Sequence, residues 1–406
     1  MSQNHDMSDP NQFQIEEDED ITGLVLSGGG ARAAYQVGVL HQLAKWFEQE
    51  NKREFDFPFK ILCGTSAGAI NAAALACAGR NFYQSTERMM RVWENFSSDQ
   101  VFRSDSLGII RTGARWLSAL SIGWMLRKRP KCLLDNSPLS SLLNQLLHFR
   151  RLDEALENGT IHALAVTASS YSSGRSVTFF QTQKVIESWA RTQRVALPDR
   201  ITVEHLLASA AIPFVFPSIK LDIEGKMEYF GDGSIRQLAP ISPAIHLGAN
   251  RVMVIGSSQS EKDHTAAIEM QNAYPSLAQI AGHAMASIFL DSLSIDIERL
   301  SRVNKTLGLL PPEMATRTTL KPIELLVISP SERIDEIAAR HTQDLPRPVR
   351  TLMSALGATE ASGSSLASYL LFEANYTREL IRMGIADTIA KREEVYAFFH
   401  LGKSDG

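Results

Sequence analysis

The sequence predicts an α/β fold with a parallel sheet, and two strand–turn–helix units near the N-terminus carry that prediction. The first unit runs from apolar residues 24–26 through a glycine-rich turn into a segment whose apolar side chains, from Ala34 to Phe47, recur at helical spacing. The second runs from residues 59–63 through a Gly-Thr-Ser-Ala-Gly turn into an alanine-rich helix. Consecutive units of this kind place their strands parallel, with the helices covering the sheet.

Apolar runs later in the chain extend this sheet. Separate strands are expected at four places, 161–168, 177–181, 251–256 and 323–329. Two further short strands flank a Glu-Gly turn and predict a hairpin, at 219–222 and 227–230. About a hundred mostly helical residues separate the second strand from the third, which is enough chain for a cap over the sheet.

Composition predicts the domain organisation. At 406 residues the chain exceeds the size at which one hydrophobic core usually stops growing. Residues 1–20 are polar and acidic, which is typical of a disordered tail. One large α/β domain is expected over residues 21–340, with a helical insertion at about 80–158. Residues 341–350 carry two prolines and are interpreted as a linker, so that 341–406 form a linker and a helical C-terminal extension.

Composition also argues against several classes of function. The formal net charge of −4 argues against nucleic acid as a partner, because neutralising phosphates requires a basic face. The N-terminus lacks the features of a secretory signal, and no run of about 18 apolar residues is present to span a bilayer. A cytoplasmic location is expected, with any membrane contact peripheral. The cysteines lie in no metal-binding spacing, so we expect neither metal nor cofactor, and a homodimer is compatible with the sequence.

The turn after the second strand, Gly64-Thr65-Ser66-Ala67-Gly68, has the Gly-x-Ser-x-Gly form. A serine on a sharp strand-to-helix turn presents its hydroxyl to a cleft, and small flanking residues keep neighbouring backbone from colliding with the turn. The pattern also arises by chance, and it suits an ordinary glycine-rich helix N-cap. Its position between a predicted strand and a predicted helix favours Ser66 as a nucleophile.

The turn after the first strand, Gly28-Gly29-Gly30-Ala31-Arg32, offers consecutive backbone N–H groups at the start of a helix. Such a loop holds negative charge, either a phosphate or the oxyanion of an acyl intermediate. The loop also fits a relaxed Gly-x-Gly-x-x-Ala dinucleotide fingerprint, which expects an acidic residue at the end of the second strand. That strand ends in Gly-Thr-Ser instead, so an oxyanion donor is the better interpretation.

A nucleophilic serine requires a base, and Asp232 is the candidate. It stands between two glycines just after the predicted hairpin, a position that presents a carboxylate to a cleft. An ordinary Asp-Gly turn at a strand end is the competing interpretation. The chain has ten histidines in no telling motif, and His205, His246 and His283 lie in helix-like segments.

Together these motifs resemble the patatin-like phospholipases. That family has a Gly-Gly-Gly-x-Arg loop, a Gly-x-Ser-x-Gly turn one helix later and an Asp-Gly pair far downstream. The resemblance implies a three-layer α/β/α fold with a mainly parallel central sheet. It also implies a Ser–Asp dyad, with Ser66 as nucleophile, Asp232 as base and Gly28–Arg32 as the oxyanion loop. It is close over about residues 21–256 and looser to about 330.

Two further segments resemble the same family. Residues 208–214 resemble its Ser-x-Ala-x-Pro segment, and residues 366–391 resemble a tail of longer bacterial members. Ser234 departs from the family pattern, in which Gly or Ala is commoner after Asp-Gly. The resemblance implies that Arg32 orients the glycine loop; binding of a substrate phosphate is the alternative.

The expected activity is hydrolysis of fatty-acyl esters of membrane lipids. Two other classes stay open, a catalytically silent or ligand-gated lipid-binding or signalling module on the same fold and, less favoured, a nicotinamide-dependent oxidoreductase. The sequence does not select among phospholipid, lysophospholipid and neutral glyceride.

The insertion contains a candidate membrane-contact segment. Trp116 and Trp124 fall on one face of a predicted helix, and the basic residues Arg127, Lys128 and Arg129 follow. Aromatic anchors beside a basic cluster suit an interface with anionic lipids. A helix that packs its tryptophans on the domain core, with a solvated basic end, explains the pattern equally well.

Overall fold

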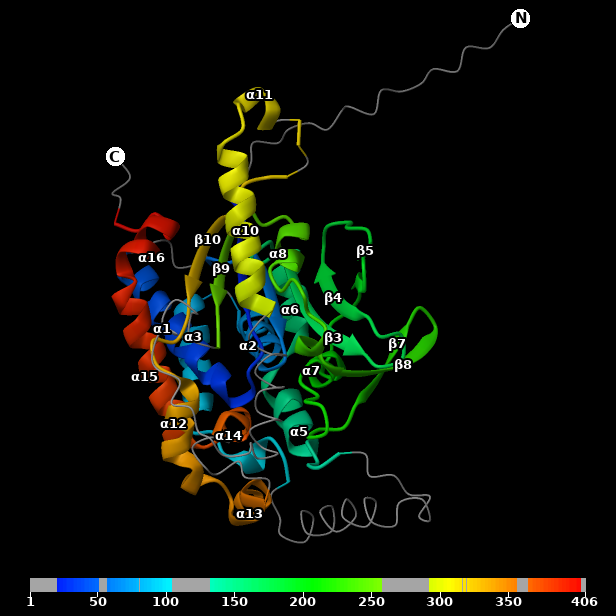
Figure 1. Ribbon diagram of the computed structural model, residues 1–406, viewed down its shortest axis with the longest axis vertical. Coiled ribbons are helices and arrows are strands. Elements are labelled where there is room, and N and C mark those ends of the chain that lie inside the picture. The colour runs from blue at the N-terminus through cyan, green and yellow to red at the C-terminus, as the bar shows by residue number, and fades with distance from the viewer. Residues whose placement is uncertain are drawn as a thin grey trace, which may run out of the picture.

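A computed structural model describes residues 20–50, 57–79, 81–103, 132–257, 292–355 without 316 and 319, and 364–402. The prediction of an α/β fold with a mainly parallel central sheet is confirmed (Figure 1). Five parallel strands stand side by side in the order β10-β9-β1-β2-β3. Their bounds are Glu324–Ile328, Arg251–Ile255, Thr22–Leu26, Ile61–Thr65 and Ala163–Ser170.

The buried side chains of these strands alternate between two hydrophobic clusters, one on each face of the sheet. On β1, Leu24 and Leu26 pack into the cluster beneath α1 and α2, and Val25 packs into the cluster beneath α8 and α10. This alternation is the period-2 pattern of a strand covered on both faces. The covering helices named here are α1 (Ala34–Gln49), α2 (Ala67–Ala76), α8 (Ser242–His246) and α10 (Ser292–Gly308).

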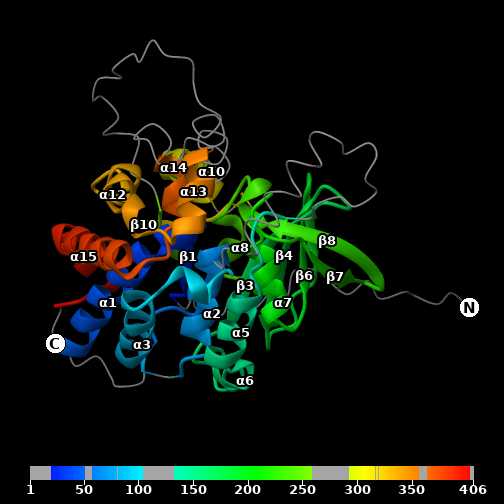
Figure 2. The same cartoon turned by 90° about the horizontal axis from the view of Figure 1, so that it is seen from below.

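Beyond β3 the sheet continues with mixed and antiparallel strands. The path runs from β3 to β4, β6 and β5, and the predicted hairpin β7–β8 also joins β3. The bounds are Ser176–Thr182 for β4, Trp189–Arg191 for β5, Arg194–Pro198 for β6, Ile219–Ile223 for β7 and Lys226–Asp232 for β8. In both views the hairpin lies at the side of the molecule opposite α15 (Figures 1 and 2).

The remaining helices come from the predicted insertion, from the connections and from the C-terminal region. The insertion contributes α3 (Phe82–Glu94), η2 (Ser98–Gln100), α5 (Ser137–Leu146) and α6 (Phe149–Glu157). The connections contribute η1 (Gly30–Ala33), α7 (Val203–Ser209), η3 (Gly233–Ile235) and α11 (Pro312–Ala315). The C-terminal region contributes α12 (Ile334–His341), η6 (Thr342–Asp344), α13 (Arg347–Ala355), α14 (Ser364–Leu370), α15 (Ala374–Ala390) and α16 (Arg392–Phe399).

The C-terminal helices share the hydrophobic core of the α/β domain. Helix α15 lies against α1 at backbone contact distance, because a Cβ added at Gly38 would stand 2.1 Å from the carbonyl oxygen of Ile381. A Cβ at Gly384 would likewise stand 2.3 Å from the carbonyl oxygen of Tyr35. The segment expected as a linker, 341–350, contains η6 and the start of α13. Residues after 340 therefore add to the main core.

No helix in the described part of the chain has the length and hydropathy needed to cross a bilayer. Apart from Asp20, the expected disordered tail lies outside the described residues. The segment with Trp116, Trp124, Arg127, Lys128 and Arg129 also lies outside them, so its membrane contact stays a prediction.

Candidate active site

Ser66 occupies a sharp turn between β2 and α2. Its backbone has φ 56° and ψ −131°, a conformation that a residue with a side chain rarely adopts. The flanking glycines permit the turn, since a Cβ at Gly64 would stand 2.5 Å from Cα of Ala69. A Cβ at Gly68 would stand 2.3 Å from the carbonyl oxygen of Leu26. The turn is therefore the strained strand-to-helix type that presents a serine hydroxyl.

Strand β3 brings Ser66 and Asp232 together. One edge of β3 pairs with β4, and its other edge pairs first with β2 and then with β8. Thr65 is opposite Thr167, and Asp232 is opposite the next residue, Ala168. The end of β2 and the end of β8 thus meet on adjacent residues of one strand. Ser66 and Asp232 become neighbours although 166 positions separate their numbers.

The Asp232 carboxyl is fully buried. Its Oδ1 accepts a hydrogen bond of 2.9 Å from the Ser234 N–H, and Oδ2 has no partner of good geometry among the described residues. Burial raises the pKa of Asp232 from 3.8 to about 6, while the nearby Ser66 hydroxyl and hydrogen bonding from Ser234 oppose that rise. Asp232 is therefore a stronger base than an exposed aspartate, with one oxygen open to accept a proton.

The hydroxyl of Ser209, at the end of α7, ties the Ser66 turn to β3. The Ser66 N–H donates to Ser209 Oγ at 2.8 Å, and Ser209 Oγ–H donates to the carbonyl of Thr167 at 2.6 Å. The Asp232 N–H donates to the carbonyl of Ala211 at 2.9 Å, two residues further on. Sequence reasoning reached residues 208–214 only through the family resemblance and assigned Ser209 no role.

The glycine turn Gly28–Arg32 lies beside Ser66. Gly30 and Ser66 line the same cavity. No described residue accepts a hydrogen bond from the N–H groups of Gly28, Gly29, Gly30 or Ala31, which leaves these donors available. The Gly28 carbonyl accepts a 2.6 Å hydrogen bond from Ser257 Oγ.

Arg32 points away from any substrate. It is 1% exposed, and its guanidinium donates to Ser368 Oγ and to Asp335 Oδ1, each at 2.8 Å. Of the two roles considered for Arg32, this placement suits orientation of the glycine loop and disfavours binding of a substrate phosphate.

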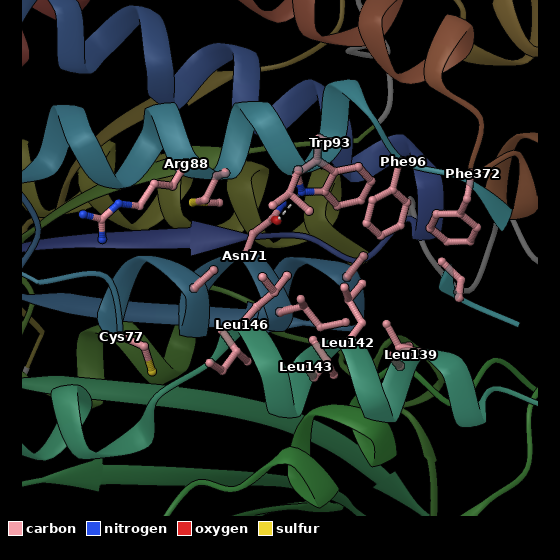
Figure 3. Close-up of a pocket in the computed structure, with 18 of the residues that line it drawn as sticks. Asn71, Cys77, Arg88, Trp93, Phe96, Leu139, Leu142, Leu143, Leu146 and Phe372 are labelled. Carbon is pink, nitrogen blue, oxygen red and sulfur yellow. Dashed lines mark hydrogen bonds between the residues drawn. The ribbon is translucent and has the colours of Figure 1, made fainter. Parts of the chain in front are cut away.

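An apolar cavity of about 380 Å³ has Ser66 in its wall and follows α2. Figure 3 shows its labelled side chains between α3 and α5, with Phe372 toward one end and Cys77 and Arg88 toward the other. Lining residues recur along α2 from Ser66 to Cys77, so the cavity follows this helix for roughly 15 Å. Asn71 accepts a 3.1 Å hydrogen bond from Trp93 Nε1 and fixes the tryptophan in the wall. Most of the wall is apolar: Ile70, Ala74, Met89, Val92, Phe96, Val101, Leu139, Leu142, Leu143, Leu146, Leu147, Ile212, Phe216 and Phe372.

None of the histidines in the described residues lines this cavity. His205 lies 3.4 Å from Asp199 and packs edge-on against Phe179. His246 stacks on Trp189 and bonds to the carbonyl of Ser242. The third histidine considered, His283, lies outside the described residues. Asp232 is the titratable side chain that this part of the structure places beside Ser66.

A family model described as patatin-like phospholipase matches residues 24–245, more than half of the chain. The chain belongs to the patatin-like phospholipase family. Membership indicates a lipid acyl hydrolase in general terms. The matched residues include the glycine turn Gly28–Arg32, the Ser66 turn and Asp232. The match ends before α10 and all later helices.

Comparison with solved structures finds VipD from Legionella pneumophila, at 14% sequence identity and a TM-score of 0.32. The alignment covers 90% of this chain and 67% of VipD. A search of curated proteins finds no significant match. Across the described residues no group of three or more potential ligands could hold a metal ion.

Proposed function

We propose that this chain hydrolyses fatty-acyl esters of lipids by a serine mechanism, with Ser66 as nucleophile and Asp232 as base. One observation carries the proposal. Adjacent residues of β3 hold a buried carboxylate beside a strained serine, and that serine lines an apolar cavity. Nucleophile and base in contact, beside a binding site, are the arrangement that acyl transfer requires.

The reaction proceeds in two steps. Ser66 Oγ attacks the ester carbonyl carbon while its proton passes to Asp232 Oδ2, and the tetrahedral intermediate expels the alcohol, which takes that proton. Asp232 then accepts a proton from water, whose oxygen attacks the acyl-enzyme carbonyl. Release of the fatty acid restores the Ser66 hydroxyl and the Asp232 carboxylate.

The glycine turn supplies stabilisation of the oxyanion. The free N–H groups of Gly28, Gly29, Gly30 and Ala31 lie at the start of η1, where backbone donors and the helix dipole favour negative charge. Arg32 contributes by holding this turn in place. The contacts of Gly28 with Ser257 and of Arg32 with Ser368 and Asp335 hold this turn, which limits its rearrangement as charge develops.

The cavity along α2 receives the acyl chain. Its apolar wall and its length of roughly 15 Å suit a medium-length hydrocarbon chain better than a polar substrate. The same cavity would serve a catalytically silent lipid-binding module, and the buried base of raised pKa beside Ser66 favours turnover. We further propose that residues 21–340 form the catalytic domain and that 341–406 complete its core.

Mass spectrometry of lipids tests this function. Purified protein is incubated with mixed membrane lipids, and wild type should release free fatty acids that the Ser66→Ala variant does not release. The matched control is Ser141→Ala, because Ser141 is exposed on α5 and bonds only to its own helix. Equal lipid profiles for wild type and Ser66→Ala would refute the proposal. The products would also show which class of lipid is cut.

A further inference from the structure

Two helices far along the chain hold the arginine of the glycine turn. The guanidinium of Arg32 donates from Nε to Ser368 Oγ on α14 and from Nη2 to Asp335 Oδ1 on α12, each at 2.8 Å. It also stacks over the Tyr369 ring, 4.3 Å from the ring centre. These contacts fix both the direction and the plane of the guanidinium.

The backbone of the turn rests on the same helix. Gly30 has φ +55°, and a Cβ at this position would stand 2.2 Å from the carbonyl oxygen of Tyr369. Neighbouring residues of α14, Ser368 and Tyr369, therefore support the Arg32 side chain and the Gly30 backbone together. One short helix thus contacts the middle of the turn, at Gly30, and the side chain at its end, Arg32.

Asp335 balances a buried charge. The Arg32 side chain is 2% exposed, and among the described residues Asp335 is the carboxylate that forms an ion pair with it. Without this carboxylate the guanidinium would keep only neutral acceptors, Ser368 Oγ at 2.8 Å and the two Ser365 oxygens at 3.5 Å, which leave its buried charge uncompensated and hold it less firmly. Movement of Arg32 would carry the glycine turn with it.

The same C-terminal segment reaches the acyl cavity. Phe372 lines the cavity two residues after α14. The next residue, Glu373, accepts hydrogen bonds from the Ser98 hydroxyl at 2.7 Å and from the Ser98 N–H at 3.3 Å. One stretch of chain thus contacts the proposed oxyanion loop and the proposed acyl site, and it lies beyond the residues that the family model matches.

We propose that Asp335 and Ser368 are positioning residues that act through Arg32 to hold the Gly28–Gly30 donors in register with Ser66. The C-terminal helices are then part of the working active site. The inference rests on the proposed acyl hydrolase function. Displacing oxyanion donors by about 1 Å lowers a rate by on the order of a hundredfold, so partial loosening has a smaller, measurable effect.

Kinetics on a soluble short-chain ester test the proposal with Asp335→Asn, Ser368→Ala and the conservative Asp335→Glu. Asp335→Asn should lower kcat by about 10- to 100-fold with little change in KM, and should slow fluorophosphonate labelling of Ser66 in parallel. Ser368→Ala, which retains the ion pair, should lower kcat by about 3- to 10-fold, and Asp335→Glu should recover part of the loss. The matched control is Glu336→Gln on the same helix, whose carboxylate pairs with exposed Arg333 at 3.3 Å and should leave kcat unchanged.

Hydrogen exchange supplies a readout that does not depend on turnover. Amides of Gly28–Arg32 should exchange faster in Asp335→Asn and Ser368→Ala, while those of the Ser66 turn stay at the wild-type rate. If Asp335→Asn does not fold, kcat and amide exchange of Ser368→Ala alone test the inference. Unchanged kcat and unchanged exchange in folded variants would overturn the inference. If wild type shows no Ser66-dependent hydrolysis, the proposed function fails instead, and exchange in Gly28–Arg32 still decides whether these residues position the turn.

Discussion

The two turns that meet at the candidate active site are held in different ways. The Ser66 turn depends on its own glycines, Gly64 and Gly68, and on the hydroxyl of Ser209 at the end of α7. The Gly28–Arg32 turn depends on side chains that follow it by 229, 303 and 336 positions, namely Ser257, Asp335 and Ser368.

This difference shows how much of the site a local motif can specify. The Ser66 turn, its support and Asp232 all lie within residues 24–245, the range of the family match. The glycine turn carries an equally clear motif, but its geometry depends on helices beyond that range. The Ser66 end of the candidate site is therefore specified by the residues that the family model matches, and the glycine turn also requires the rest of the chain.

The largest expected effect is loss of the nucleophile. Ser66→Ala should lower kcat on a soluble ester by at least about 10⁴-fold, because no described hydroxyl can replace it at the turn. The fold should survive, since only one hydroxyl is removed. Circular dichroism and kinetics check both statements, with Ser141→Ala as the unaffected control. Retained activity in a folded Ser66→Ala protein would place the chemistry elsewhere.

The next expected effect is a change in the free energy of unfolding when the buried Asp232 is replaced by Asn. The folded state holds the Asp232 proton more tightly than the unfolded chain does, so wild type loses stability as the pH rises from 3.8 towards about 6. Asn does not ionise, so Asp232→Asn should raise the free energy of unfolding by about 3 kcal/mol above pH 6. The gain should vanish below pH 3.8.

Denaturant titrations at several pH values measure this gain. The matched control is Asp222→Asn on the same hairpin, where the carboxylate is exposed and caps the turn at Gly225. A stability difference for Asp232→Asn that does not depend on pH would contradict the assignment of a raised pKa to Asp232.

The support of the Ser66 turn sharpens the comparison with the glycine turn. Ser209→Ala leaves the Ser66 N–H and the Thr167 carbonyl without their shared partner, which should cost about 1–3 kcal/mol of stability. It should lower kcat by about 10- to 100-fold. Hydrogen exchange should rise at residues 64–68 and stay unchanged at Gly28–Arg32. A rise at both turns would mean that the two supports are not independent.

The smallest expected effect is on substrate choice. Phe372→Leu opens space in the cavity wall, so kcat/KM should shift by about tenfold in favour of bulkier or longer acyl chains, and turnover of a short ester should hardly change. A series of esters of increasing chain length measures the shift. Equal changes for every chain length would assign Phe372 to stability alone.

The sequence predicts the parallel half of this fold well, for a physical reason. Buried parallel strands are continuous apolar runs, as in Leu24–Leu26 and residues 251–255, and they are read directly from composition. The edge strand Trp189–Arg191 and its neighbour Arg194–Pro198 were not predicted, because they are short and only partly buried. The seating of α15 on α1 escaped prediction because it depends on two glycines that approach each other only in three dimensions.

The candidate site divides in the same way. Ser66, Asp232 and the glycine turn each carry a local sequence motif. Ser66 and Asp232 become neighbours because Thr65 pairs with Thr167 and Asp232 pairs with Ala168, and this strand register is not visible in the motifs. Ser209, Asp335, Ser368 and Phe372 carry no pattern of their own. Their roles follow from contacts across 143 or more positions, which a single sequence does not reveal.

The central claim is that Asp232 activates Ser66, and the pH dependence of fluorophosphonate labelling tests it most directly. The adduct is located by peptide mass spectrometry, and labelling rates are compared for wild type, Asp232→Asn and Asp222→Asn. The account predicts an adduct on Ser66, a rate that rises through about pH 6 as the Asp232 carboxyl ionises, and loss of labelling in Asp232→Asn alone. An adduct on another residue, or full-rate labelling of Asp232→Asn, would contradict it.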